Sequence, residues 1–100
     1  MSSECILVVE DHQETLRALC AYLESSGFQV LAAADGATAM HIMRQEKPNL
    51  VLLDLMLPDR DGMDIARAVR SDPYLKATPI IMLTARVDDK DKIVGLELGA

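Results

Sequence analysis

The chain has 100 residues, half of them hydrophobic and 3% aromatic, with a formal net charge of −6. This length fits one domain, and the apolar content supports a packed core and excludes a disordered chain. The acidic balance argues against direct binding of nucleic acid. No apolar run approaches the roughly 18 residues of a membrane span, and the N-terminus lacks the basic start of a secretory signal. Two cysteines without zinc spacing indicate buried, reduced thiols and a cytoplasmic protein.

The chain begins with a strand and a helix. Residues 5–9 form a continuous, largely β-branched run, which indicates a strand buried on both faces. An apolar stripe with helical spacing follows and stops at Gly27, and it consists of Leu16, Leu19, Cys20 and Leu23. Residues 28–32 then predict a weaker strand near an edge of the sheet.

The same alternation continues to the end of the chain. A second helix lies between the capping residue Asp35 and Pro48, and residues 50–53 form the next strand. A third helix closes before Pro73 and precedes a strand over residues 80–83. The apolar positions of the second, third and fourth helices are Ala39, Ile42 and Met43, then Ile65, Ala68 and Val69, then Ile93, Val94, Leu96 and Leu98.

This order predicts an α/β fold, a doubly wound parallel sheet with right-handed crossovers and helices on both faces. Such a sheet normally adds another strand and helix after the fourth helix. The chain ends at Gly99 and Ala100, before that strand. We therefore expect either a fragment or a fold that closes differently.

Acidic residues follow the buried strands at the edge where an open parallel sheet binds its ligands. Glu10 and Asp11 come after the first strand, Asp54 after the third and Thr84 after the fourth. Three clustered carboxylates repel one another, and Mg²⁺, which prefers oxygen ligands, is the natural positive partner. Alternatively the acids cap helices, as Asp11 could for the first helix. That alternative leaves Asp54 unexplained, because it lies inside an apolar stretch and precedes no helix.

Four motifs in order resemble the receiver domain of two-component response regulators. They are ILVVED at residues 6–11, LLDLMLP at 52–58 with Gly62, PIIMLTA at 79–85 and GLELGA at 95–100. The resemblance covers residues 4–100. It implies a flavodoxin-like fold with strand order 2-1-3-4, from which the fifth strand and helix are missing.

The resemblance also implies a site. Asp54 would accept a phosphoryl group from a sensor histidine kinase or a phosphotransfer protein, which calls for an exposed, ionised carboxylate. Thr84 would contact the phosphoryl group and switch the loop after it, and the backbone of the small residue Ala85 would lie near that group. The Mg²⁺ ligands would be Glu10, Asp11, Asp54 and the backbone carbonyl of Met56. The chemistry would be self-directed, so the domain would be no enzyme, and a longer parent protein would carry a transcriptional output domain.

The resemblance has one gap and leaves alternatives. The family's lysine after the fifth strand and its aromatic switch residue have no counterpart in these 100 residues. If the chain is complete, we expect weakened phosphorylation and an unpaired edge that favours a homodimer or exchange of elements. One alternative is a truncated or non-phosphorylated receiver that acts only as an interaction module. A flavodoxin-like carrier is disfavoured because this chain has no phosphate-binding loop after Val9. An aspartyl-phosphate phosphatase is disfavoured because the position of its second aspartate is Met56 in this chain.

Overall fold

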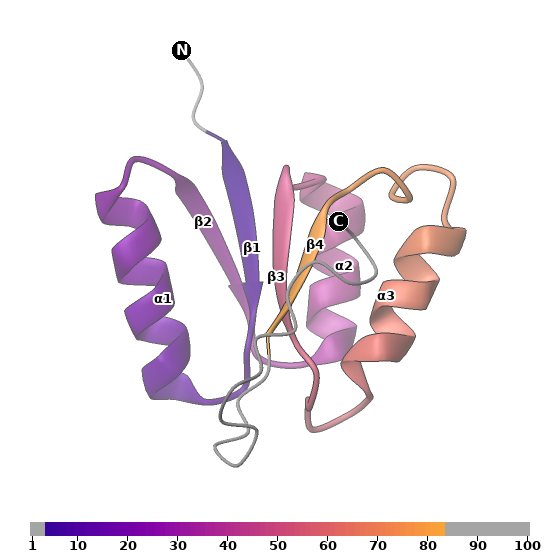
Figure 1. Cartoon of the computed structure of the whole chain (residues 1–100), viewed down its shortest axis with the longest axis horizontal. Coiled ribbons are helices and arrows are strands. Elements are labelled where there is room, and N and C mark those ends of the chain that lie inside the picture. The colour runs from indigo at the N-terminus through magenta and orange to yellow at the C-terminus, as the bar shows by residue number, and fades with distance from the viewer. Residues whose placement is uncertain (1–3, 84–100) are drawn as a thin grey trace.

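A four-stranded parallel sheet forms the centre of the molecule. The computed structural model describes residues 4–83, and the sheet order is β2-β1-β3-β4 (Figure 1). The strands are β1 (Cys5–Val9), β2 (Gln29–Ala33), β3 (Leu50–Asp54) and β4 (Ile80–Leu83). The predicted strand order and the edge position of the second strand are confirmed.

Helices cover both faces of this sheet, as the alternation of elements predicts. Helix α1 (Gln13–Ser25) packs on one face, while α2 (Gly36–Glu46) and α3 (Gly62–Ser71) pack on the other (Figure 1). The predicted fourth helix, marked by Ile93 to Leu98, lies outside the described residues. None of the helices within residues 4–83 is long and apolar enough to cross a membrane.

The continuous apolar runs are explained by the two covered faces. Successive side chains of a strand point to opposite faces. In β1, Leu7 and Val9 therefore join the cluster under α2 and α3, while Ile6 and Val8 join the cluster under α1. A strand between two helical layers has no solvent face, so its sequence does not alternate between apolar and polar residues.

Short polar side chains start α2 and α3. Asp35 accepts a hydrogen bond from the amide of Thr38 (2.8 Å), which confirms its predicted role as the cap of α2. Asp61 accepts one from the amide of Met63 (2.9 Å) at the start of α3. Helix α2 ends at Lys47, whose φ of 48° lies in the left-handed region.

Three local predictions are wrong. In α3, Ala68 is exposed and Ala66 is buried, because the arc facing the sheet is set by Ile65 and Val69 and includes position 66. The two cysteines are half-buried free thiols, since Cys5 is the first residue of the otherwise buried β1 and Cys20 lies on α1, where only Leu16 is buried. Asp11 caps nothing: α1 begins at Gln13 with His12 as its N-cap, so Asp11 lies one residue too early.

Candidate functional site

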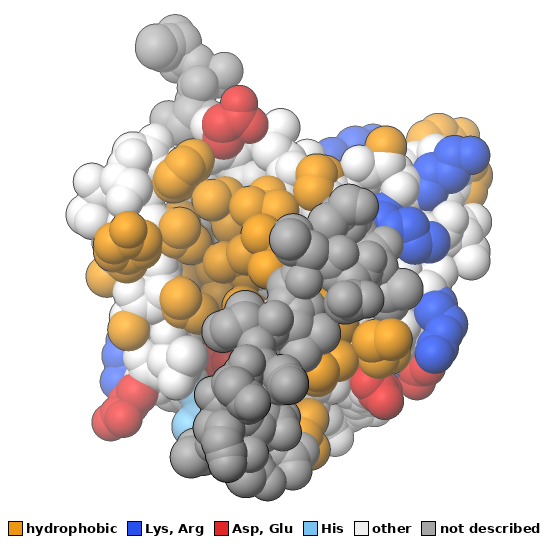
Figure 2. All heavy atoms as spheres, in the orientation of Figure 1, with side chains coloured by type: hydrophobic (Ala, Val, Ile, Leu, Met, Phe, Trp, Pro, Cys, Tyr) orange, Lys and Arg blue, Asp and Glu red, His pale blue; other side chains and the backbone are white. Residues whose placement is uncertain are grey.

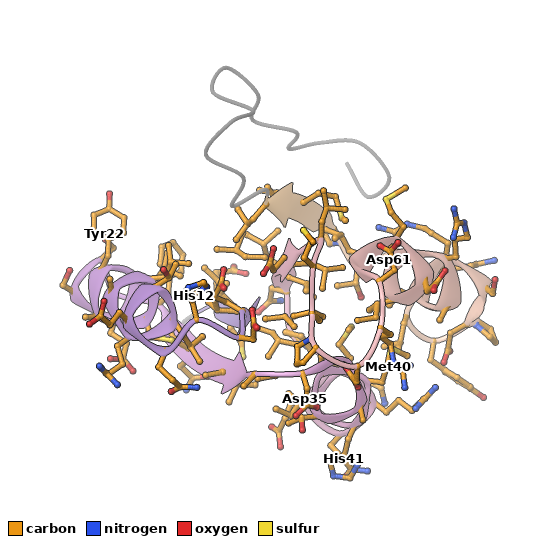
Figure 3. The ribbon with its side chains drawn as sticks, turned by 90° about the horizontal axis from the view of Figure 1, so that it is seen from below. His12, Tyr22, Asp35, Met40, His41 and Asp61 are labelled. Carbon is orange, nitrogen blue, oxygen red and sulfur yellow. The ribbon has the colours of Figure 1, made fainter. Side chains whose placement is uncertain are left out.

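The strands end, and the three helices begin, at one edge of the molecule. Figure 3 is seen from this side and places His12, Asp35 and Asp61 at the starts of α1, α2 and α3. Helix N-termini carry a partial positive charge. This edge therefore offers a setting in which negative groups are favoured.

Sheet register brings Glu10 and Asp54 together. Val8 pairs with Leu52 across the parallel strands β1 and β3, so two residues further on position 10 comes opposite position 54. Neighbouring strands lie about 4.8 Å apart, and residues at this spacing of two share one face. The predicted meeting of these two carboxylates at the carboxyl edge thus follows from the register.

Glu10 is buried and held in place by the backbone. Glu10 is only 2% exposed. Its amide donates to the carbonyl of Ala33 (3.0 Å), which extends the ladder between β1 and β2 by one residue. Its Oε2 accepts a hydrogen bond from the amide of His12 (3.0 Å). The carboxylate is therefore fixed at the point where the chain leaves the sheet.

Asp54 is also buried, at 3% exposure, where the sequence reasoning expected an exposed carboxylate. It is the last residue of β3, and the start of α3 packs against its backbone at Gly62. Its Oδ1 accepts a hydrogen bond from the amide of Met56 (3.3 Å). By contrast, Asp11 is exposed and gives the cluster its solvent side.

The site concentrates negative charge. Burial, followed by the nearby charge of Asp11, raises the pKa of Asp54, against the lowering effect of the Met56 amide and the Glu10 side chain. Burial also raises the pKa of Glu10, and the charges of Asp54 and Asp11 raise it further. Among residues 4–83, no lysine or arginine forms an ion pair with any of the three carboxylates. The arrangement therefore lacks a cation within the described chain.

His12 joins this cluster, which the sequence did not suggest. One ligand atom each of Glu10, Asp11 and His12 lies within 4.8 Å of the others, and His12 Nδ1 lies 3.9 Å from Glu10 Oε2. The His12 side chain is largely exposed. Because Mg²⁺ prefers oxygen to imidazole nitrogen, His12 fits better as the residue whose amide orients Glu10.

A tight loop follows Asp54 and carries the carbonyl of Met56. Met56 pairs with Asp61 across the base of the loop, and the Gly62 amide donates to the carbonyl of Leu55 (2.8 Å). A Cβ at Gly62 would clash with the carbonyl oxygen of Asp54 and would lie 2.8 Å from the Cα of Leu55. A glycine at position 62 is thus required because two backbones approach closely there.

One residue of this loop has a role that the sequence did not reveal. The carboxylate of Asp59 accepts hydrogen bonds from the amides of Gly36 (2.7 Å) and Ala37 (3.0 Å) at the start of α2. Its partners are more than twenty residues away in sequence, so no local pattern could identify them. Thr84 and Ala85, also predicted for the site, lie outside the described residues.

Two hollows lie on the described surface. A hollow of about 240 Å³ adjoins the loop after Asp54 and is lined by Leu55, Met56, Leu57, Arg60 and Asp61. A second, of about 320 Å³, lies where α2 and α3 end and is lined by Arg44, Lys47, Asp72, Tyr74 and Leu75. Neither of these two hollows is lined by Glu10, Asp11 or Asp54.

Comparison with known proteins agrees with this geometry. The family model for the response regulator receiver domain matches residues 6–100. The transcriptional regulatory protein GltR of Pseudomonas aeruginosa is 46% identical over 95 residues, which are 95% of this chain and 39% of that protein. The alkaline phosphatase synthesis transcriptional regulatory protein PhoP of Bacillus subtilis is 43% identical over 95 residues, with the same coverage of both chains. The chain thus spans about two fifths of the length of these curated relatives.

Solved structures share the fold. The phosphorylated cyanobacterial phytochrome response regulator RcpA superposes with a TM-score of 0.79 at 33% identity, over 90% of this chain and 71% of that one. The Mn²⁺-bound form of response regulator Rcp1 gives a TM-score of 0.74 at 34% identity, over 86% and 70% of the two chains. Motifs, sheet order, acidic edge and family match agree, and the chain belongs to the receiver domain family of two-component response regulators.

Proposed function

We propose that Asp54 accepts a phosphoryl group from a phosphohistidine of a sensor kinase or phosphotransfer protein, with Mg²⁺ bound at the same edge. The observation that carries this proposal is the register that sets Glu10 beside Asp54, with Asp11 on the solvent side. Burial raises the pKa values of both carboxylates, so a bound cation would stabilise their ionised forms. Asp54 also lies at the end of its strand, where a nucleophile can meet a donor.

The transfer needs one bond formed and one broken. A carboxylate oxygen of Asp54 attacks phosphorus, and the P–N bond of the phosphohistidine breaks. The histidine nitrogen keeps the electron pair, and the donor ring, which carries a proton on its other nitrogen, leaves as a neutral imidazole. The amide of Met56, which donates to Asp54 Oδ1, orients the carboxylate so that the other oxygen can attack.

The residues present fit Mg²⁺. Glu10, Asp11, Asp54 and the Met56 carbonyl form an all-oxygen set, which is the donor type that this ion takes. When bound, the ion supplies positive charge that favours the ionised carboxylates and offsets charge on the transferred group. Burial of Glu10 and its hydrogen bond from His12 mean that this ligand needs little ordering when the ion enters.

The product carries almost two additional negative charges beside existing carboxylates, a change large enough to shift a two-state element. We assign the phosphoryl contact and the switch to Thr84, beside the backbone of Ala85. The domain acts on itself and on no other substrate. Two half-buried free cysteines suit the cytoplasm, where thiols stay reduced.

The output proposed for the longer parent protein is transcriptional. Curated relatives GltR and PhoP are named transcriptional regulatory proteins, and each is more than twice as long as the matched segment. RcpA was solved phosphorylated and Rcp1 with Mn²⁺, which supports phosphotransfer and a divalent cation for a similar site.

Intact mass spectrometry after incubation with acetyl phosphate and Mg²⁺ tests the proposal. We expect the wild-type chain to gain one phosphoryl group, and we expect no gain in Asp54→Asn or after chelation of Mg²⁺. The same assay is run on a chain extended to the length of the curated relatives. A phosphoryl group that persists in Asp54→Asn, or no gain in the extended chain, contradicts the proposal and favours an interaction module.

A further inference from the structure

The loop between β3 and α3 is attached to a helix that takes no part in the carboxylate cluster. Asp59, at the tip of this loop, accepts hydrogen bonds from the first two amides of α2, those of Gly36 and Ala37, at 2.7 and 3.0 Å. The Gly36 amide, then that of Ala37, lowers the pKa of Asp59, so its carboxylate is ionised at neutral pH. A helix N-terminus favours such a charge.

A second contact strengthens this attachment. The side chain of Arg60 lies against Gly36, where an added Cβ would come within 2.6 Å of its Cγ and Cδ. Arg60 Nε also lies 3.7 Å from Asp59 Oδ2. Asp59 and Arg60, at the tip of the loop, therefore both contact the first turn of α2.

The base of the loop is fixed independently. Met56 pairs with Asp61, and the Gly62 amide donates to the carbonyl of Leu55. Met56 and Asp61 thus bracket the tip of the loop, residues 57–60, and the described contacts attach this tip to the start of α2. The Met56 carbonyl is the proposed ligand that lies on this loop, two residues beyond the end of β3 at Asp54.

We propose that Asp59 is a positioning residue for the metal site: by binding the start of α2 it fixes the loop that presents the Met56 carbonyl. This inference rests on the proposed function, because Met56 matters only if the cluster binds Mg²⁺. A residue that orients a ligand from outside the coordination sphere commonly changes metal affinity without touching the ion.

Asp35 provides a matched control. It caps the same helix through the Thr38 amide, and its replacement removes the same charge, but it does not belong to the loop. Asp59→Ala and Asp35→Ala should both weaken the start of α2. Only Asp59→Ala should release the loop.

Titration calorimetry with Mg²⁺ alone, together with thermal unfolding in metal-free buffer, separates the two effects. We expect Asp59→Ala to weaken Mg²⁺ binding about tenfold, and Asp35→Ala to leave the affinity unchanged while it lowers the melting temperature. Asp59→Asn, which keeps one acceptor oxygen, should bind Mg²⁺ with an intermediate affinity.

The outcomes distinguish this inference from the proposed function. Wild-type affinity in Asp59→Ala, or an equal loss in Asp35→Ala, overturns the positioning role and leaves the proposed function standing. If the wild-type chain binds no Mg²⁺, or Asp54→Asn binds it as well as wild type, the proposed function fails and the inference fails with it.

Discussion

Within residues 4–83, the two faces of the sheet differ in how completely they are buried. The face under α2 and α3 holds one large cluster whose strand members, such as Leu7, Val51 and Leu53, are fully buried. On the α1 face, the buried cluster consists of Ile6, Val8 and Leu16, and the surrounding apolar residues are only partly buried. Figure 2 shows hydrophobic side chains at the surface beside α1.

The carboxylates belong to the less covered face. By strand alternation, Glu10 continues the row of Ile6 and Val8, and Asp54 continues the row of Leu50 and Leu52. We therefore expect the face under α2 and α3, which we call the sealed face, to supply most of the stability, whereas the α1 face carries Glu10 and Asp54 at its carboxyl end. Glu10 and Asp54 are themselves buried, so water or a cation would reach them from the side of the exposed residue Asp11.

The largest expected effect on stability comes from truncating one of two neighbouring leucines on β3. Leu53→Ala should lower the free energy of unfolding by about 3 kcal/mol, because it leaves a cavity in the sealed core. Leu52→Ala makes the same chemical change on the α1 face, where the side chain is half-buried, and should lower it by about 1 kcal/mol. Urea unfolding measures both. Equal losses would show that the two faces contribute alike.

A smaller effect is expected where α3 meets β3 on the sealed side. Gly62→Ala places a Cβ against the Asp54 carbonyl and should lower the free energy of unfolding by about 2 kcal/mol. Ala68→Ser, on the exposed side of the same helix, serves as the control and should change stability by less than about 0.5 kcal/mol. If Gly62→Ala leaves the free energy of unfolding unchanged, α3 can move away from the end of β3 without loss of stability.

The smallest effect concerns charge on the α1 face. The raised pKa values of Glu10 and Asp54 mean that the folded chain binds protons more readily than the unfolded chain. The stability they contribute is present below the unfolded values, near pH 4, and is lost as pH rises through the raised folded values. At neutral pH without metal, Asp54→Asn should therefore stabilise the fold by about 1 kcal/mol, or roughly 4–8 °C.

Thermal unfolding of wild type and Asp54→Asn from pH 4 to pH 8 measures this difference, which should widen as pH rises. Mg²⁺ should narrow it, because it stabilises only the chain that keeps the full set of carboxylates. A wild-type chain that is the more stable of the two at pH 7 without metal would contradict this electrostatic account.

Local patterns were enough to predict the elements. Two strands, Cys5–Val9 and Ile80–Leu83, have the predicted bounds, and Asp35 caps α2 as expected, because apolar runs and capping residues act within a few positions. Motif order was also enough to recognise the family, which the family model confirms. The acids at strand ends could be named for the same reason, since each directly follows an apolar run.

Contacts between distant segments were decided only by the tertiary structure. The register of β1 against β3 places Glu10 beside Asp54, the approach of α3 buries Asp54 and requires Gly62, and Asp59 reaches the start of α2. The burial of Ala66, where the sequence predicted burial of Ala68, has the same origin, because contact with the sheet determines which side of α3 is buried. Periodicity states which residues prefer burial, but the crossovers and the strand register determine which of them meet.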